Sequence, residues 1–507
     1  MIKKGTIIEG EFLSNSNGSA YVVNESLHFD VFIDKKNTEK ALHKDKVKVE
    51  VIKTKYDFVE GKIINVLERF KDKFVGTLEV NENFAFLIPD SNKIKKDFFI
   101  PLDKLNGGKD GQKAVIEMIS WEDDKRNPKG FVVEVLGEKG DNDAEIHSIL
   151  HEYNLPYKFD NKVEEEANLI PSFPTEEEIS KRKDLRGVLT LGIDPEDSKD
   201  ADDTISIEWV NNDCFISINI ADVSYYVQEG SEIDKEAYKR GNSVYLVDRC
   251  IPMLPEKLSN NICSLKSGSD KLAFTVTFKI KNGKVIDKWF GKTIINVNKD
   301  YTYEEAQEVI ENGIREKFNL TDNAILELNT IAKQLREERN KNNFLSIIKQ
   351  EIRFKLDENN KPIDVLFKTS KDSNKLIEEF MLLANKEVAK FIKEKSSICI
   401  NRAHEEPERM KLEELKSFIN QFNYTLDITG DSDEIKVELN KLLKNSFNTP
   451  EYDMISNLIT KIQQKAFYTT KDVSHFGLGF DDYSHFTSPI RRYSDILIHR
   501  ILYMLIK

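Results

Sequence analysis

Hydrophobic and polar residues alternate through two similar stretches in the first 140 positions of the chain. The alternation covers 5–12, 20–24, 29–34 and 46–53 in the first stretch, and 74–80, 83–89, 97–101, 112–121 and 129–136 in the second. A period of two is typical of half-buried strands. About five short strands in roughly seventy residues fit a small closed barrel of the OB type, and a pair of packed sheets is the alternative. We therefore predict two all-β barrels, over 1–67 and 68–140.

The rest of the chain mixes strand-like and helix-like patterns. A polar connector is expected over 141–180. Beyond it, apolar runs predict strands at 187–193, 214–220, 243–247, 271–280 and 351–355. Helical spacing of apolar residues predicts amphipathic helices at 323–341, 373–395, 410–422, 450–467 and 490–506. The predicted fold class is multidomain: two N-terminal all-β OB-type barrels followed over 181–507 by a mixed α/β domain.

Composition and charge refine this picture. Of the 507 residues, 39% are hydrophobic, which is too many for an intrinsically disordered chain. The 88 acidic and 75 basic side chains give a net charge of −13, which taken alone argues against a nucleic-acid partner. However, residues 1–140 contain 24 acidic and 24 basic side chains. The whole negative excess therefore lies in residues 141–507.

Two absences bear on location. No apolar run reaches the roughly 18 residues that a membrane span needs, so no membrane partner is expected. The four cysteines show no Cys-x-x-Cys spacing; they are Cys214, Cys250, Cys263 and Cys399. This spacing predicts a reduced, cytoplasmic location, with neither a zinc site nor a disulfide framework.

A cluster of aspartates is the sharpest chemical feature of the sequence. A predicted strand delivers Asp194 at its end, Pro195 forces a turn, and Asp200, Asp202 and Asp203 follow within ten residues. Carboxylates this close repel one another unless cations neutralise them. Hard oxygen ligands of this kind suit Mg²⁺, with Mn²⁺ as a second candidate.

Calcium binding and a solvated turn are two other interpretations of the aspartate cluster. A calcium loop is excluded because the sixth position from Asp194 is not glycine and the twelfth, Ile205, is not glutamate. A solvated acidic turn is the simpler alternative. The apolar strands predicted on both sides of the turn favour a metal site, because they anchor the turn in a core.

A carboxylate-bound metal points to phosphoryl transfer or hydrolysis, in which a positive side chain offsets the charge on the phosphate. Arg491 and Arg492 are the candidates. Ser488 and Pro489 predict a helix start, which places both arginines in the first turn, near the positive end of the helix dipole. Cations are unfavourable there, so we expect an anionic ligand at this end. Surface arginines paired with Asp495 are the alternative.

Four separated motifs in a fixed order resemble the RNB family of exoribonucleases, in particular its ribonuclease R branch. The motifs are 191–205, 241–265, 401–407 and 475–500. The two predicted barrels resemble the paired cold-shock domains of this family, so the resemblance covers nearly the whole chain and makes 181–507 an RNB catalytic domain. The family continues with further helices and an RNA-binding OB domain, which we expect to be missing from a sequence that ends at Lys507.

The resemblance implies processive hydrolysis of single-stranded RNA from a free 3′ end, with release of nucleoside 5′-monophosphates. The implied metal ligands are Asp194, Asp200, Asp202 and Asp203. The implied catalytic residues are Asp202, Tyr245, Glu378, Arg491 and Arg492, and the implied RNA-binding residues are Tyr21, Phe84, Phe86, Tyr245, Arg402 and His404. We expect a monomer, with ribosomes or other RNA-decay factors as further partners.

Two segments depart from the family pattern. Asn343 and Ile347 stand where the family has a glycine and an aromatic residue that stacks on the terminal base. Stacking is worth about 1–3 kcal/mol per base, so a weaker grip on the last nucleotide is expected. The first barrel keeps only Tyr21 of an RNA-facing strand, whereas the second keeps Phe84 and Phe86. We therefore expect the second barrel to stack bases better than the first.

Two other functions stay open on the sequence. One is a ribonuclease II-type exoribonuclease that is restricted to single strands. The other is a non-catalytic RNA-binding protein that keeps the scaffold without turnover. The presence of all four aspartates and both arginines argues against the second.

Overall fold

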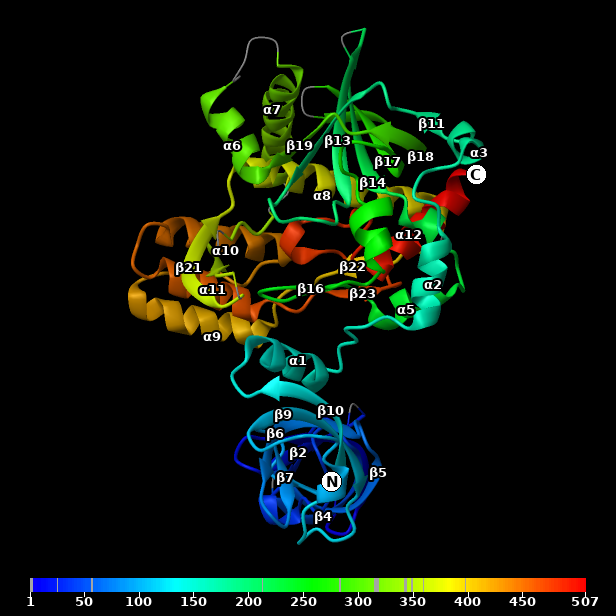
Figure 1. Cartoon of the computed structure of the whole chain (residues 1–507). Coiled ribbons are helices and arrows are strands. Elements are labelled where there is room, and N and C mark those ends of the chain that lie inside the picture. Colours follow the sequence, from blue (N-terminus) through cyan, green and yellow to red (C-terminus); the bar gives the residue numbers. More distant parts are fainter. Residues whose placement is uncertain are drawn as a thin grey trace. The chain divides into compact units, whose positions relative to one another are not determined.

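The computed structural model describes the whole chain except residues 1, 2, 25, 56, 57, 212, 282, 283, 314–318, 342, 343, 348, 349, 359 and 397. The chain forms two compact units (Figure 1). The smaller unit contains residues 1–158 with 358–361, and the larger contains 159–357 and 362–507. None of the helices in these described ranges is both long and apolar enough to cross a membrane.

Two closed five-stranded barrels make up most of the smaller unit, which confirms the predicted barrels. The first has the order β1-β2-β3-β5-β4, and its strands are β1 (Ile7–Ser14), β2 (Ala20–Val23), β3 (Val31–Ile33), β4 (Lys46–Lys55) and β5 (Phe58–Glu68). The second has the order β10-β8-β7-β6-β9, and its strands are β6 (Lys73–Val80), β7 (Ala85–Pro89), β8 (Phe98–Ile100), β9 (Gln112–Ser120) and β10 (Lys129–Glu138).

β5 was not among the predicted strands, because glycine and asparagine interrupt its alternation. The structure explains the glycine. A Cβ atom at Gly61 would lie 2.4 Å from the Cγ1 of Val49 and 2.8 Å from that of Val31. The missing side chain therefore lets β5 pass close to the interior of the barrel.

A seven-stranded sheet forms the centre of the larger unit, in the order β11-β18-β17-β14-β13-β12-β19. Its strands are β11 (Lys183–Asp184), β12 (Leu189–Asp194), β13 (Asp203–Val210), β14 (Asp213–Ala221), β17 (Asp270–Lys281), β18 (Lys284–Asn296) and β19 (Lys299–Thr302). β12 is antiparallel to β13 and parallel to β19. Helices α7 (Leu320–Asn340) and α8 (Asp372–Lys395) pack on this sheet, where Leu328 and Phe380 join Ile216 and Val276 in one core.

Shorter elements complete the two units. Helices α1 (Asn142–Glu152), α2 (Asn161–Leu169) and α3 (Glu176–Ser180) lie in the connector region, and α4 (Val223–Tyr226), α5 (Glu232–Arg240) and α6 (Tyr303–Asn312) follow sheet strands. Helices α9 (Arg409–Ile419), α10 (Ser432–Ser446) and α11 (Tyr452–Ile462) share a separate core. The small strand pairs are β15 (Val244–Tyr245) with β16 (Cys250–Ile251), β20 (Gln350–Leu356) with β21 (Pro362–Thr369), and β22 (Asn401–Ala403) with β23 (Phe467–Thr469).

The last helix, α12 (Tyr493–Ile506), begins later than predicted, so the placement of both arginines in its first turn was wrong. Residues 491–493 instead bond to a distant segment. Ser243 N donates to Arg491 O at 3.0 Å, and Tyr493 N donates to Gly241 O at 2.9 Å. Arg492 is the extended residue at the helix start, and Asp495 is the acidic residue of the first turn.

Candidate active site

The four aspartates lie at one edge of the central sheet. Asp194 ends β12 and Asp203 begins β13, and the antiparallel pairing of these strands brings the two ends together. The loop between them is held by a segment far along the chain. Leu265 N donates to Ala201 O at 2.9 Å, and Ser264 Oγ donates to Lys199 O at 2.9 Å. The loop is therefore fixed by tertiary contacts.

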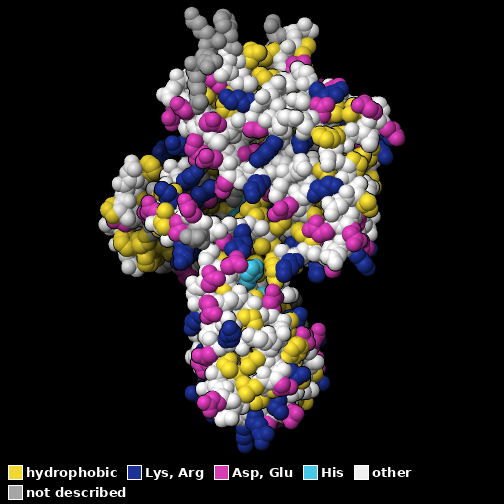
Figure 2. All heavy atoms as spheres, viewed as in Figure 1, with side chains coloured by type: hydrophobic (Ala, Val, Ile, Leu, Met, Phe, Trp, Pro, Cys, Tyr) yellow, Lys and Arg dark blue, Asp and Glu magenta, His cyan; other side chains and the backbone are white. Residues whose placement is uncertain are grey.

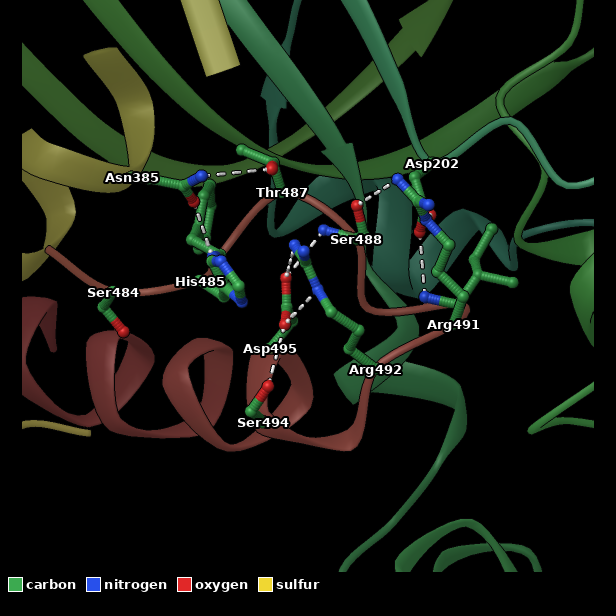
Figure 3. A network of polar contacts seen from close by, with 12 residues as sticks. Asp202, Asn385, Ser484, His485, Thr487, Ser488, Arg491, Arg492, Ser494 and Asp495 are labelled. Carbon is green, nitrogen blue, oxygen red and sulfur yellow. Dashed lines mark hydrogen bonds and ion pairs between the residues drawn. The ribbon is translucent and has the colours of Figure 1, made fainter. Parts of the chain in front are cut away.

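Asp202 is bound by the segment that carries the arginines. Ile490 N donates to its Oδ1 at 2.8 Å, and Arg491 Nε donates to its Oδ2 at 3.2 Å. Figure 3 shows Arg491 turned toward Asp202 from the chain just before α12. The two motifs, almost 290 positions apart, thus meet in one site.

Burial raises the pKa of three of the aspartates, and neighbouring carboxylates raise it further. Burial raises the pKa of Asp202 to about 7, although Arg491 opposes the shift. Burial, with a contribution from Asp300, raises the pKa of Asp194 to about 6, and Lys266 opposes it. The pKa of Asp203 lies well above its usual value because of burial and then the charges of Asp194 and Asp202. Such mutual repulsion is what a bound cation relieves.

The donor set fits a hard divalent cation, which binds oxygen ligands only. Asp200 accepts a hydrogen bond from the Tyr245 hydroxyl at 2.7 Å, and Asp202 is bound by Ile490 and Arg491. In the described part of the chain, no three carboxylate, imidazole or thiol groups are arranged to hold a metal ion as they stand. Mg²⁺ needs only one or two carboxylates with water and substrate phosphate. Asp194 and Asp203, at the adjoining ends of β12 and β13, are the candidates.

The structure separates the roles of the two arginines. The Arg491 side chain is 47% exposed and donates to Asp202 and to Ser488 Oγ at 3.0 Å. Arg492 is 25% exposed and forms two hydrogen bonds to the fully buried Asp495, at 2.9 and 2.7 Å. Arg491 is therefore the arginine beside the aspartates, and Arg492 faces the opposite side of this segment (Figure 3).

Tyr245 and Glu378 have different surroundings. The Tyr245 ring is 52% exposed, and its hydroxyl anchors Asp200, so this residue belongs to the aspartate site. Glu378 is an exposed residue of α8, with its Oε1 3.9 Å from an Arg339 nitrogen. Its neighbour Glu379 is buried and paired with Arg336 and Arg339. The catalytic role of Glu378 stays a prediction, because its carboxylate lies beside Arg339.

Arg402 and His404 lie on β22 but differ in what they can contact. The Arg402 guanidinium lies over the Tyr468 ring, 4.7 Å from its centroid. His404 is buried, and its two ring nitrogens bond to Gln464 O at 2.9 Å and Gly477 N at 3.0 Å. Both ring nitrogens of His404 are therefore engaged in hydrogen bonds to the backbone, and direct RNA binding by His404 would require these bonds to break.

The segment 341–347 is partly described. Asn343 lies outside the described residues. Ile347 packs against the core shared by α9, α10 and α11. An aliphatic side chain suits this position because its surroundings are apolar.

Each barrel carries a cluster of three aromatic rings. In the second barrel, Phe84, Phe86 and Phe99 follow one another with centroid distances of 5.6 and 5.7 Å. In the first barrel, Tyr21, Phe32 and Phe58 do the same at 5.5 and 5.7 Å, with rings from β2, β3 and β5. The sequence indicated only Tyr21, because the other two rings lie on different strands, β3 and β5.

Tyr303 is a site residue that the sequence did not indicate. The register of β12 and β19 pairs Asp194 with Thr302, and Tyr303 follows directly. Burial raises the pKa of the Tyr303 phenol, and the charges of Asp203 and Asp194 raise it further. Only the strand pairing brings this phenol to the aspartates, so no local signal could have found it.

Three family descriptions match successive parts of the chain. The RNB domain matches residues 182–507, the ribonuclease B OB domain 10–66, and the cold shock domain 86–160. Ribonuclease R of Thermotoga maritima is 35% identical over 99% of this chain, which spans 70% of that relative. The chain spans 61% of ribonuclease R of Vibrio parahaemolyticus and 73% of ribonuclease R 2 of Lactococcus lactis.

Two solved structures have a fold similar to that of this chain. The structure of Mycoplasma genitalium RNase R in complex with ribose-methylated single-stranded RNA has a TM-score of 0.92 at 25% identity, covering 98% of this chain and 79% of that one. Yeast Ssd1, described as a pseudonuclease, has a TM-score of 0.72 at 20% identity, and the match covers 99% of this chain and 69% of the Ssd1 chain. A pseudonuclease shares this fold, so the fold alone does not determine whether a chain is catalytic.

Proposed function

The chain belongs to the RNB family, and from this premise we propose that it is a 3′→5′ exoribonuclease that processively hydrolyses RNA to nucleoside 5′-monophosphates. The observation that carries the proposal is the convergence of four aspartates from one loop with Arg491 from the far end of the sequence. Single-stranded RNA with a free 3′ end is the proposed substrate, and structured RNA with a single-stranded 3′ extension is included.

Mg²⁺, or Mn²⁺ in its place, is the proposed cofactor. Asp194 and Asp203 would hold it, since burial and mutual repulsion leave their charges in need of a cation. When bound, such an ion activates water and neutralises charge on the leaving oxygen. Tyr245 orients Asp200, and Ile490 N orients Asp202, so that these carboxylates are preorganised beside the other two.

Arg491 supplies the positive charge that phosphodiester cleavage needs. Its guanidinium is fixed by Asp202 and Ser488 but remains half exposed, so it can contact a phosphate without first leaving its position. Donors that are fixed before the reaction stabilise the developing charge most effectively. The Tyr303 phenol lies in the same charged surroundings and can donate to a phosphate oxygen or to water.

The test uses the full chain with Mg²⁺ and a 3′-labelled single-stranded RNA. We expect the label to appear at once in a mononucleotide, and Asp202→Asn to abolish its release while circular dichroism shows an unchanged fold. Internal cleavage products, or unchanged activity in Asp202→Asn, would contradict the proposal. RNA binding by the wild type without a metal-dependent product would favour a non-catalytic protein.

Substrate structure separates two versions of this function. A ribonuclease R-type enzyme should degrade a duplex that carries a 3′ single-stranded overhang, whereas a ribonuclease II-type enzyme should stop near the duplex. We propose the first, supported by the similarity to ribonuclease R over nearly the whole chain. A cytoplasmic location is proposed as well, supported by four cysteines that are all free thiols.

A further inference from the structure

A short segment just before β17 holds the backbone of the aspartate loop. We call residues 264–267 the loop-binding segment. Ser264 Oγ accepts a hydrogen bond from Ala201 N at 3.1 Å and donates one to Lys199 O at 2.9 Å. This single hydroxyl therefore binds the backbone on both sides of Asp200, one of the candidate metal ligands.

The two ends of the loop-binding segment are anchored in different ways. Leu265 is buried in a hydrophobic core. Ser267 is exposed, and its backbone N and its Oγ both donate to Asp300 Oδ2, at 3.0 and 2.7 Å. Asp300 belongs to β19, the last strand of the central sheet. A carboxylate from this edge strand thus holds the exposed end of the segment.

A glycine of β12 makes room for this carboxylate. The parallel pairing of β12 with β19 places Gly192 opposite Asp300. A Cβ atom at Gly192 would lie 2.9 Å from Asp300 Oδ1, and the three heavy atoms nearest to it would all belong to Asp300. Any side chain at position 192 would therefore push the carboxylate away from Ser267.

An acidic residue at position 300 is electrostatically unfavourable for the aspartate site. After burial, the charges of Lys266 and Asp300 have the largest effects on the pKa of Asp194, with Lys266 lowering it and Asp300 raising it. Repulsion between carboxylates has to be offset by other interactions. The two hydrogen bonds from Ser267 are such interactions, so the role of Asp300 is that of a hydrogen-bond acceptor.

We propose that Asp300 is a positioning residue: by binding Ser267 it fixes the loop-binding segment, and through Ser264 it sets the direction of Asp200 before metal and RNA bind. The inference rests on the proposed function. Asp300 and Ser267 both lie at the surface. Loss of their contact should therefore loosen the aspartate loop locally and leave the larger unit folded.

The first experiment measures the loop directly, in EDTA and without RNA. Hydrogen exchange is followed by mass spectrometry in a peptide covering 196–203 of the full chain. We expect Asp300→Ala to speed exchange there by about ten-fold, because two hydrogen bonds to a charged acceptor are lost. Asp300→Asn keeps an oxygen acceptor and should exchange like the wild type. Unchanged exchange in Asp300→Ala, or equally fast exchange in Asp300→Asn, would overturn the inference.

The control variant is Asp213→Ala. Asp213 is also a carboxylate of the central sheet, and it is paired with Lys279 at 2.5 Å. It begins β14 at the end of the β13–β14 pair opposite to Asp203. We expect exchange in 196–203 to stay at the wild-type rate. Acceleration equal to that of Asp300→Ala would overturn the inference, because the effect would then be unspecific.

The close approach at Gly192 supplies a reciprocal test. Gly192→Ala should reproduce the fast exchange of Asp300→Ala, because the added methyl group displaces the carboxylate. In the double variant Gly192→Ala/Asp300→Ala the displaced group is absent, so exchange should be no faster than in Asp300→Ala alone. Additive effects of the two substitutions would contradict the proposed arrangement.

Metal binding connects the loop to function. Mn²⁺ is titrated into the metal-free chain, and the free ion is measured by its electron paramagnetic resonance signal. We expect about ten-fold weaker binding in Asp300→Ala and wild-type binding in Asp300→Asn. In RNA hydrolysis, Asp300→Ala should need more Mg²⁺ for half-maximal turnover, with the KM for RNA unchanged at saturating Mg²⁺. Wild-type Mn²⁺ affinity in Asp300→Ala would overturn the inference.

Failure of the proposed function has a different signature. A wild-type chain that releases no mononucleotide from RNA would contradict the proposed function. Hydrogen exchange and Mn²⁺ binding need no turnover, so they would still decide whether Asp300 fixes the loop.

Discussion

Arg491 and Arg492 are neighbours in the chain, but they have different partners. Arg491 contacts Asp202 and stays half exposed, whereas Arg492 donates two hydrogen bonds to the carboxylate of the buried Asp495. A charge that is accessible to a phosphate contributes mainly to turnover, and a charge that neutralises a buried carboxylate contributes mainly to stability.

We therefore expect opposite outcomes for the two matched substitutions. Arg491→Gln should lower RNA turnover by about 100-fold with little change in the free energy of unfolding. Arg492→Gln should lower the free energy of unfolding by about 2 kcal/mol, because Asp495 loses its positive partner inside the protein. Single-turnover hydrolysis and urea unfolding measure the two effects. The assignment is wrong if both variants lose the same stability.

The buried Asp202 makes stability depend on pH. Its pKa is about 7 in the folded chain but has the ordinary value of 3.8 when unfolded. Between these values only the folded state holds the proton, so the contribution of Asp202 to stability falls as the pH rises. In EDTA, the stability of Asp202→Asn relative to the wild type should therefore be greater near pH 8 than near pH 5, by about 1–3 kcal/mol. Urea unfolding at the two pH values measures this, and a relative stability that is no greater near pH 8 would contradict it.

At the scale of elements, the two barrels resemble each other more than their sequences do. β2 of the first barrel supplies one aromatic residue, but β3 and β5 complete a cluster with the same centroid spacing as in the second barrel. Phe58 is 46% exposed and Phe84 is 42% exposed. The structure therefore gives no reason for one barrel to stack bases better than the other.

Matched substitutions test this equivalence. Each exposed ring can stack one base, which is worth about 1–3 kcal/mol, so Phe58→Ala and Phe84→Ala should each weaken binding of single-stranded RNA by about ten-fold. Ile64→Ala, a substitution of another exposed residue of β5, is the control and should have no effect. Weaker binding in Phe84→Ala alone would restore the expectation drawn from the sequence.

At the scale of the whole molecule, the chain forms two compact units, and its net negative charge lies outside the first 140 residues. The first 140 residues are neutral, and the net charge of −13 comes from the remainder. Basic and acidic side chains are interspersed over the face shown in Figure 2, which limits non-specific attraction of RNA. Each unit has its own buried core, and the aspartate site belongs to the larger one.

Calorimetry can detect this division. Two units with separate cores should unfold in two transitions. A ligand stabilises only the unit that binds it, so Mg²⁺ should raise the midpoint of one transition and leave the other in place. The shift should be larger near pH 8 than near pH 5, because protonated aspartates bind the ion poorly. A single transition that moves as a whole would contradict the division.

The sequence by itself determined the elements whose signal is local. Alternation with period two identified nine of the barrel strands, because consecutive residues of a half-buried strand face the core and the solvent in turn. The aspartate run and the arginine pair were visible for the same reason, since each lies within one short segment. The sequence also identified the family, through motifs in a fixed order.

Only the tertiary structure decided how these segments meet. The helix start at Tyr493, the pairing of Arg491 with Asp202, and the place of Tyr303 all depend on contacts between distant segments. The same holds for Phe58, and for Arg402 against Tyr468. A side chain's neighbours across strands and loops set its charge, exposure and hydrogen bonds, and these neighbours leave no trace in the residues beside it in sequence. Local pattern therefore predicted which chemistry is present, and packing determined which residues perform it.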